Sequence, residues 1–137
     1  MADVNPHVDT PVPGGMPGLL TMPRSGRRVI TATLMAGQVV MLDISNPKKF
    51  RQLSVVSFGK DTGPHSVHLT HDDKRLVVTD YFLNQDDFGK VHLEGDHKVH
   101  VLDVGEKTLT VDPAFQVVDF NTAFPTGPAR PHGIGMR

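Results

Sequence analysis

Histidine is the residue type that gives this sequence its clearest chemistry. The 137-residue chain has eight histidines and no cysteine, so a disulfide framework, a thiolate metal site and a cysteine nucleophile are all excluded. Three histidines follow a proline, at Pro6-His7, Pro64-His65 and Pro131-His132. Imidazoles that converge on one point can share a transition-metal ion, so His132 and His65 become candidate metal ligands if the fold brings them together.

Other groups of histidines have a less favourable geometry for binding a metal. On a β-strand, alternate side chains point to opposite faces, so His65 and His71 would face one side and His68 the other. His97 and His100 fall on opposite faces for the same reason. We therefore expect these histidines, together with His92, to have structural or solvated roles.

Carboxylates and glycines suggest no separate catalytic site. Residues 84–96 contain four acidic side chains, but their spacing fits no calcium-binding loop, and a solvated loop is the preferred interpretation. Asp43 and Asp103 end equivalent segments, which favours a role as turn or cap hydrogen bonders. The glycines at positions 59 and 63 do not have phosphate-loop spacing.

The elements that must position the histidines are short β-strands. No segment has a sustained apolar period of 3.6 residues, which predicts almost no helix. Residues 1–15 are rich in proline and glycine and are expected to form an extended arm. The β-branched and apolar runs predict strands at residues 18–23, 28–34, 38–44, 52–58, 65–70, 75–82, 97–104 and 114–120.

The strands form an internal repeat. A shift of 47 residues places Arg28 on Arg75, and a shift of 60 places Asp43 on Asp103. A shift of 62 then places residues 55–58 on 117–120. A third copy begins near the C-terminus, where Pro131-His132 overlies Pro64-His65. His65 and His132 therefore occupy the same position in successive repeats.

A four-stranded unit that recurs every 45 to 60 residues or so is typical of a β-propeller blade. The predicted fold is all-β, a partial propeller with one blade at residues 16–60, a second at 61–122 with an inserted loop at 83–96, and the start of a third at 123–137. Innermost propeller strands line the central channel, so His65 and His132 would converge on the axis. A β-sandwich with similar strands is the alternative.

Composition limits the partners of the chain. A formal net charge of −1 and a pI near 6.7 provide no basic surface for nucleic acid or an anionic membrane. No membrane span and no secretory signal are found in the sequence, so we expect a cytoplasmic location. Two blades would leave apolar faces uncovered, and we expect the chain to need further blades, from a missing segment or from self-association.

Three stretches together resemble the C-terminal third of the selenium-binding protein family, also called methanethiol oxidases. They are LMAGQVVMLDISNPKKFRQLSVV, KRLVVTDYFLNQDDFGKVHLEGDHKVHVLDV and FNTAFPTGPARPHGIGM. The matching features include Asp43 with Ser45-Asn46-Pro47, the long insertion after Tyr81, and Gly127-Pro128-Ala129 just before a histidine. The resemblance covers nearly the whole chain from about Gly15.

The resemblance implies a seven-bladed propeller and copper-dependent oxidation of methanethiol by O2 to formaldehyde, hydrogen sulfide and hydrogen peroxide. It also implies a small thiol or selenium compound as substrate. His132 best matches the C-terminal metal-ligand histidine of the family, and His65 is the second candidate. The chain departs from the family in length and in lacking the N-terminal histidine motifs, and selenium cannot attach through a cysteine. We therefore expect the chain alone to be inactive; a non-catalytic binding or scaffold module is the alternative.

Overall fold

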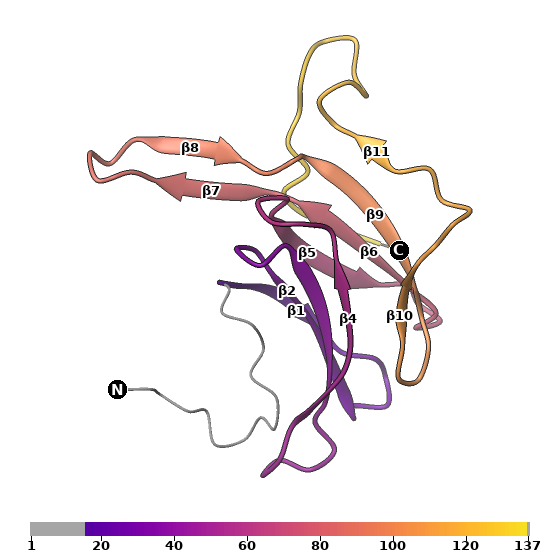
Figure 1. Ribbon diagram of the computed structural model, residues 1–137. Helices are drawn as coiled ribbons and strands as arrows, with labels where there is room; N and C mark the ends of the chain where they lie inside the picture. Colours follow the sequence, from indigo (N-terminus) through magenta and orange to yellow (C-terminus); the bar gives the residue numbers. More distant parts are fainter. Residues whose placement is uncertain (1–15, 137) are drawn as a thin grey trace.

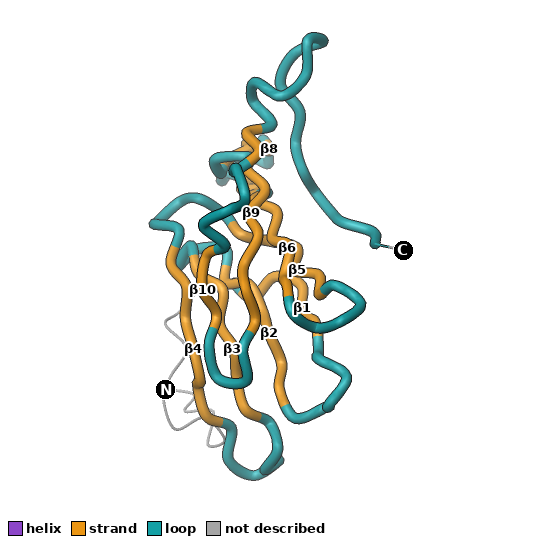
Figure 2. The backbone as a smooth tube through the Cα atoms, turned by 90° about the vertical axis from the view of Figure 1, so that its right-hand side faces the viewer, coloured by secondary structure: helices purple, strands orange, loops and turns teal. Residues whose placement is uncertain are grey.

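A computed structural model describes residues 16–136 of the chain. The dipeptide Pro6-His7 and the expected N-terminal arm lie outside the described residues. All regular elements within them are β-strands, in antiparallel pairs, and no helix is present there (Figures 1 and 2). The described part accordingly has no helix long and apolar enough to cross a membrane.

The first sheet is a four-stranded meander. Its strands are β1 (Pro17–Thr21), β2 (Arg28–Thr33), β3 (Gln38–Asp43) and β4 (Arg51–Ser57), in the spatial order β1-β2-β3-β4. β-branched residues dominate β2 and suit its pleated, half-buried surface. Gly37 turns the chain between β2 and β3 at φ +63°, where a Cβ atom would lie 1.7 Å from the carbonyl oxygen of Gly59. Only glycine fits this turn.

The second sheet repeats this arrangement. It contains β5 (Pro64–Leu69), β6 (Arg75–Asp80), β9 (Lys98–Val104) and β10 (Leu109–Val111) in the order β5-β6-β9-β10, and β11 (Val118–Asp119) also pairs with β9. Arg28 pairs with Asp43 in the first sheet and Arg75 with Asp103 in the second. The shifts of 47 and 60 residues found in the sequence therefore relate equivalent positions in space.

The outer strand of the second sheet differs from the prediction. We expected one strand at residues 114–120, whereas β10 pairs with one end of β9 and the two-residue β11 with the other. The shift of 62 is nevertheless obeyed at β11, because Ser57 pairs with Gln38 and Asp119 with Lys98. A turn at Asp112 divides the two pieces, and Pro113 within it has no N–H to donate to a ladder.

The inserted segment contains a β-hairpin where a loop was expected. β7 (Phe82–Gln85) pairs with β8 (Val91–Glu94), and the hairpin extends from the second sheet as a separate two-stranded ribbon (Figure 1). Asp86 makes the turn, because its carboxylate accepts hydrogen bonds from the backbone N–H groups of Phe88 and Lys90. Only β8 (VHLE) alternates between apolar and polar residues, β7 (FLNQ) does not, and the charged residues between them favoured a loop.

The two sheets pack face to face around one apolar core. β5 contacts β1 and β2, and β10 contacts β4. The first strands of the two sheets therefore lie beside each other, and so do the strands at their other ends. The core residues are buried aliphatic side chains from both sheets: Ile30, Ala32, Val39, Met41, Val67, Leu69, Leu76, Val78, Leu102 and Leu109.

The two sheets have the same repeat, but the first sheet buries one face of it and the second sheet buries the other. Ile30 is fully buried, whereas Val77, its equivalent at the shift of 47, is half-buried. The reverse holds one position earlier, where Leu76 is fully buried and Val29 is half-buried. The sheets therefore stack in a single direction, as successive blades do, and each has one face that the other does not cover.

Candidate functional site

The structure brings His65 and His132 together, although 67 residues separate them in the sequence. Their ring centroids lie 5.2 Å apart with an interplanar angle of 29°. The ring of Tyr81 lies 4.3 Å from that of His132 and 5.9 Å from that of His65. We call these three residues the His65–Tyr81–His132 cluster.

Irregular backbone at the ends of two strands positions this cluster. The register of β5 with β6 shifts between Pro64 and Ser66, so His65 lies within the irregularity, where a bulge can re-aim a side chain. Tyr81 follows the last residue of β6 and donates its backbone N–H to the carbonyl oxygen of Gly63 at 2.8 Å. The two side chains thus come from neighbouring strands of the innermost part of the second sheet.

His132 reaches the cluster from the C-terminal segment. The repeat predicts that a third blade, with its first strand, starts within residues 123–137, but residues 131–136 pair with no strand in the described part of the chain and are drawn as loop (Figure 2). The imidazole of His132 is exposed, and that of His65 is half-buried. A β-strand forms only where another strand pairs with it. The position of His132 instead depends on its ring contacts with His65 and Tyr81.

The environment of His65 favours a neutral imidazole. Burial lowers the pKa of His65, a hydrogen bond with the backbone of His132 acts in the opposite direction, and the charge of the His132 ring adds to the lowering. The Nδ1 atom of His65 is buried and has no hydrogen-bond partner. A neutral imidazole with an unused nitrogen is the form that binds a metal ion.

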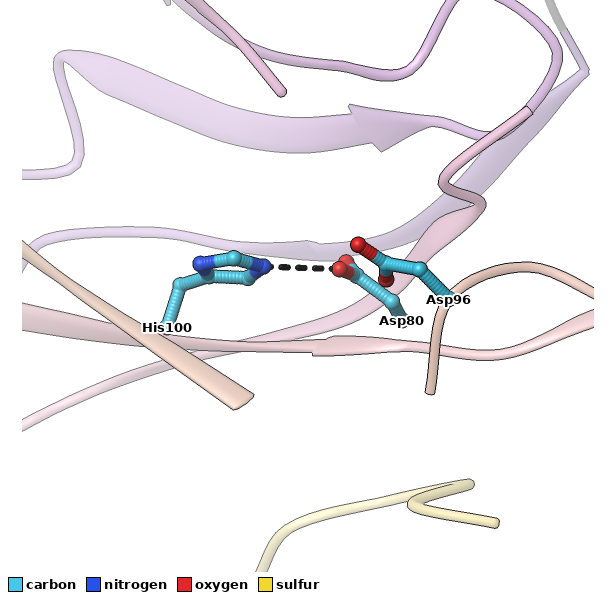
Figure 3. A group of neighbouring side chains, drawn as sticks. All are labelled: Asp80, Asp96 and His100. Carbon is cyan, nitrogen blue, oxygen red and sulfur yellow. Dashed lines mark hydrogen bonds and ion pairs between the residues drawn. The ribbon is translucent and has the colours of Figure 1, made fainter. Parts of the chain in front are cut away.

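A second polar cluster lies at the edge of the apolar core. Asp80 at the end of β6, Asp96 after the inserted hairpin and His100 in β9 place one ligand atom each within 4.8 Å of one another. Figure 3 shows the two carboxyl groups side by side, with His100 directed at Asp80. The Nε2 atom of His100 lies 2.8 Å from Oδ2 of Asp80, and its ring stacks on Phe58 at 4.2 Å.

Burial and mutual interaction separate the pKa values of the two carboxyl groups. Burial raises the pKa of Asp80 to about 7, the hydrogen bond with His100 opposes this rise, and the neighbouring Asp96 adds to it. Burial also acts to raise the pKa of Asp96, but hydrogen bonds with Asp80 and Lys98 hold it below its usual value. In this arrangement Asp80 carries the proton and Asp96 the charge.

The other histidines within residues 16–136 lie apart from both clusters. His71 is exposed and His68 half-buried, and neither joins His65 in a group of metal-ligating side chains within the described residues. His92 pairs with Asp86 at 2.8 Å in the inserted hairpin. His97 is buried, with its Nδ1 atom 3.3 Å from the side-chain oxygen of Asn121.

Asp43 caps a turn, in agreement with its expected role. Its carboxylate accepts hydrogen bonds from the backbone N–H and the hydroxyl of Ser45 and forms an ion pair with Arg51 at 2.8 Å. These hydrogen bonds, those from Ser45 first, lower the pKa of Asp43. Its equivalent, Asp103, lies 4.0 Å from Arg75.

Comparison with solved structures identifies the architecture. The chain is similar to the X-ray structure of a hypothetical selenium-binding protein from Sulfolobus tokodaii, with 21% identity and a TM-score of 0.62 over 76% of this chain and 26% of that one. The chain has the fold of a partial β-propeller.

The chain spans about a quarter of the length of the Sulfolobus tokodaii protein. A periplasmic gluconolactonase from Pseudomonas aeruginosa is also similar, with 17% identity and a TM-score of 0.44 over 78% of this chain and 40% of that one. No protein-family model and no curated protein sequence matches the chain.

The proximity of His65 and His132 was predicted from the sequence, whereas Tyr81 and the whole second cluster were not. His65 and His132 were found because they share a repeat position and a preceding proline. Asp80, Asp96 and His100 come from three elements, and Asp96 belongs to an insertion with no counterpart in the first sheet. The cross-strand pairing of Val78 with His100 is the signal that places His100 near the end of β6.

Proposed function

We propose that this chain is part of a β-propeller of the selenium-binding protein family and contributes His65 and His132 to a copper site at the propeller axis. The proposed activity is the oxidation of methanethiol: CH3SH, O2 and H2O give formaldehyde, hydrogen sulfide and hydrogen peroxide. The observation that carries this proposal is the contact of two histidine rings from successive repeats, at 5.2 Å between centroids.

The residues present fit a copper ion in their chemistry. Imidazole nitrogen is a preferred ligand of copper, and the buried, unpartnered Nδ1 of His65 is a free donor atom. Two imidazoles are fewer ligands than copper takes in proteins, and no described Asp, Glu or further His forms a metal-ligating group with them. In this proposal the other ligands come from other blades of the propeller.

The chain's own residues prepare the site in two ways. Burial lowers the pKa of His65 and so favours the neutral imidazole, which can bind a cation without first losing a proton. Tyr81 packs against both rings and restricts the orientations available to His132. Copper, when bound, would accept the sulfur of the substrate as thiolate and supply the one-electron chemistry that O2 requires.

Metal analysis of the purified chain tests the proposal. We expect stoichiometric copper in the unmodified chain, loss of copper in His132→Ala and His65→Ala, and retention in His71→Ala, which removes an exposed histidine in the turn between β5 and β6. Unchanged copper content in the first two variants would contradict the site. No copper together with ordered assembly would favour the scaffold alternative.

The activity of the isolated chain is tested separately. We expect no release of hydrogen sulfide from methanethiol, because ligands and substrate-binding surfaces from further blades are needed in this proposal. Release by the copper-loaded chain alone would contradict that requirement, while it would support the proposed chemistry.

A further inference from the structure

Two acidic side chains, one fully buried and one partly buried, lie side by side at the edge of the core (Figure 3). Asp80 is fully buried, and its Oδ1 atom has no hydrogen-bond partner. The Oδ1 atom of Asp96 is also shielded from solvent and unpartnered. Two carboxylate oxygens that approach each other away from water repel strongly unless a positive charge lies between them. In the metal-free protein the proton of Asp80 can lie between the two side chains, and the unpartnered Oδ1 atoms leave donor capacity for a cation that replaces this proton.

His100 completes a set of three donors. Its Nε2 atom lies 2.8 Å from Oδ2 of Asp80, and stacking on Phe58 with an interplanar angle of 22° fixes the plane of its ring. We propose that Asp80, Asp96 and His100 bind one divalent transition-metal ion of the zinc class. The site lies between the two sheets and does not depend on the copper proposal for His65 and His132.

The donor set and its spacing fit this class of ion. Zinc binds carboxylate oxygen and imidazole nitrogen at about 2.0 to 2.2 Å, often with water in a fourth position. The three donor atoms already lie within 4.8 Å of one another, so small side-chain rotations bring them around one centre. The carboxylates suit calcium as well, but a nitrogen donor favours a transition metal over calcium or magnesium.

The surroundings provide an entry route and support for the ligands. The Asp96 side chain is 27% exposed and its Oδ2 atom is held by Lys98 at 3.0 Å, so one edge of the cluster opens to solvent while the orientation of Asp96 is fixed. Asp96 also lies at the base of the inserted hairpin, where its backbone N–H bonds to the carbonyl oxygen of Thr62. A bound ion would fasten the hairpin to β6 and β9.

Zinc titration of the chelator-treated full chain tests this site. The experiment uses the double variant His65→Ala/His132→Ala as its background, so that the other histidine pair takes no metal. We expect one equivalent of zinc by calorimetry, a rise in Tm on zinc addition, and a visible absorption band from cobalt bound in its place. Affinity should fall at least about tenfold in Asp80→Asn and in His100→Gln, which each remove one strong ligand.

Asp86→Asn is the matched control, because Asp86 and His92 form another Asp–His pair at 2.8 Å that is more exposed. It should leave zinc affinity unchanged. If Asp80→Asn does not fold, Asp96→Asn provides the same test at a less buried ligand. Absence of zinc, cobalt and manganese binding by the unmodified chain, or equal affinity in the ligand variants and in the control, would overturn the proposal and indicate a shared proton.

Discussion

Asp80 is the residue whose environment most changes its acid–base chemistry. Burial raises the pKa of its carboxyl group to about 7, whereas in the unfolded chain it titrates near 3.8. Between these values the folded protein holds a proton that the unfolded chain has released. The free energy of unfolding of the metal-free protein must therefore decrease as the pH rises through this window.

This decrease in stability with rising pH gives the first prediction. In chelator, Asp80 should make unfolding easier at pH 7 than at pH 4 by roughly 2 to 4 kcal/mol, and Asp80→Asn should remove most of this slope because the amide does not ionise. Urea unfolding at several pH values measures the effect. An Asp80→Asn variant with the same slope as the unmodified chain would contradict the assigned role.

The residues of the two clusters differ in how far the sequence could predict them. His65 and His132 share a repeat position, and the repeat alone places them on the same side of successive units. Asp80 has no such marker, because a carboxyl group at the end of a strand is usually a turn former. Its carboxyl group lies against His100 and Asp96, and His100 stacks on Phe58 of the first repeat, so this environment depends on the packing of one sheet on the other.

At the scale of elements, the apolar pattern predicted the seven longest strands to within two residues at nearly every end. Residues 28–34 and 75–82 correspond to β2 and β6. Their runs of β-branched residues strongly favour strand structure. β10 was missed because its three residues follow a charged turn and are too short to form a pattern. The hairpin of β7 and β8 was missed because the polar and charged residues of the insertion suit a loop as well as a short two-stranded ribbon.

The second prediction compares two equivalent leucines in the stacked sheets. Leu102 is fully buried between the sheets, and Leu42, its partner at the shift of 60, is half-buried on the uncovered face. Leu102→Ala should lower the free energy of unfolding by about 2 to 5 kcal/mol, and Leu42→Ala by about 1 kcal/mol or less in the monomer. Equal losses in monomeric protein would contradict the one-sided packing.

At the scale of the whole molecule, uncovered apolar surface is the main feature. Large exposed hydrophobic side chains gather on and beside β1: Met16, Leu19, Leu20 and Met22. Leu19 and Leu20 are consecutive in β1 and lie on opposite faces of the strand, so apolar surface is exposed on both sides of β1. Exposed apolar surface favours interaction with a partner, and exposed sheet edges add unpaired backbone groups. In a propeller, the neighbouring blade covers both.

The third prediction concerns the state of the isolated chain. We expect association into dimers or larger particles that increases with protein concentration, because it removes the uncovered faces from water. Size-exclusion chromatography with light scattering measures the particle mass. A well-folded particle of 15.0 kDa at every concentration that can be reached would contradict the need for further blades.

The shared copper site of His65 and His132 is tested most directly by electron paramagnetic resonance of the chain loaded with one equivalent of Cu(II). The spectrum should contain nitrogen couplings from two imidazoles in the unmodified chain and from one in either His65→Gln or His132→Gln. A copper signal with the same nitrogen couplings in all three proteins would show that the two rings do not share the ion.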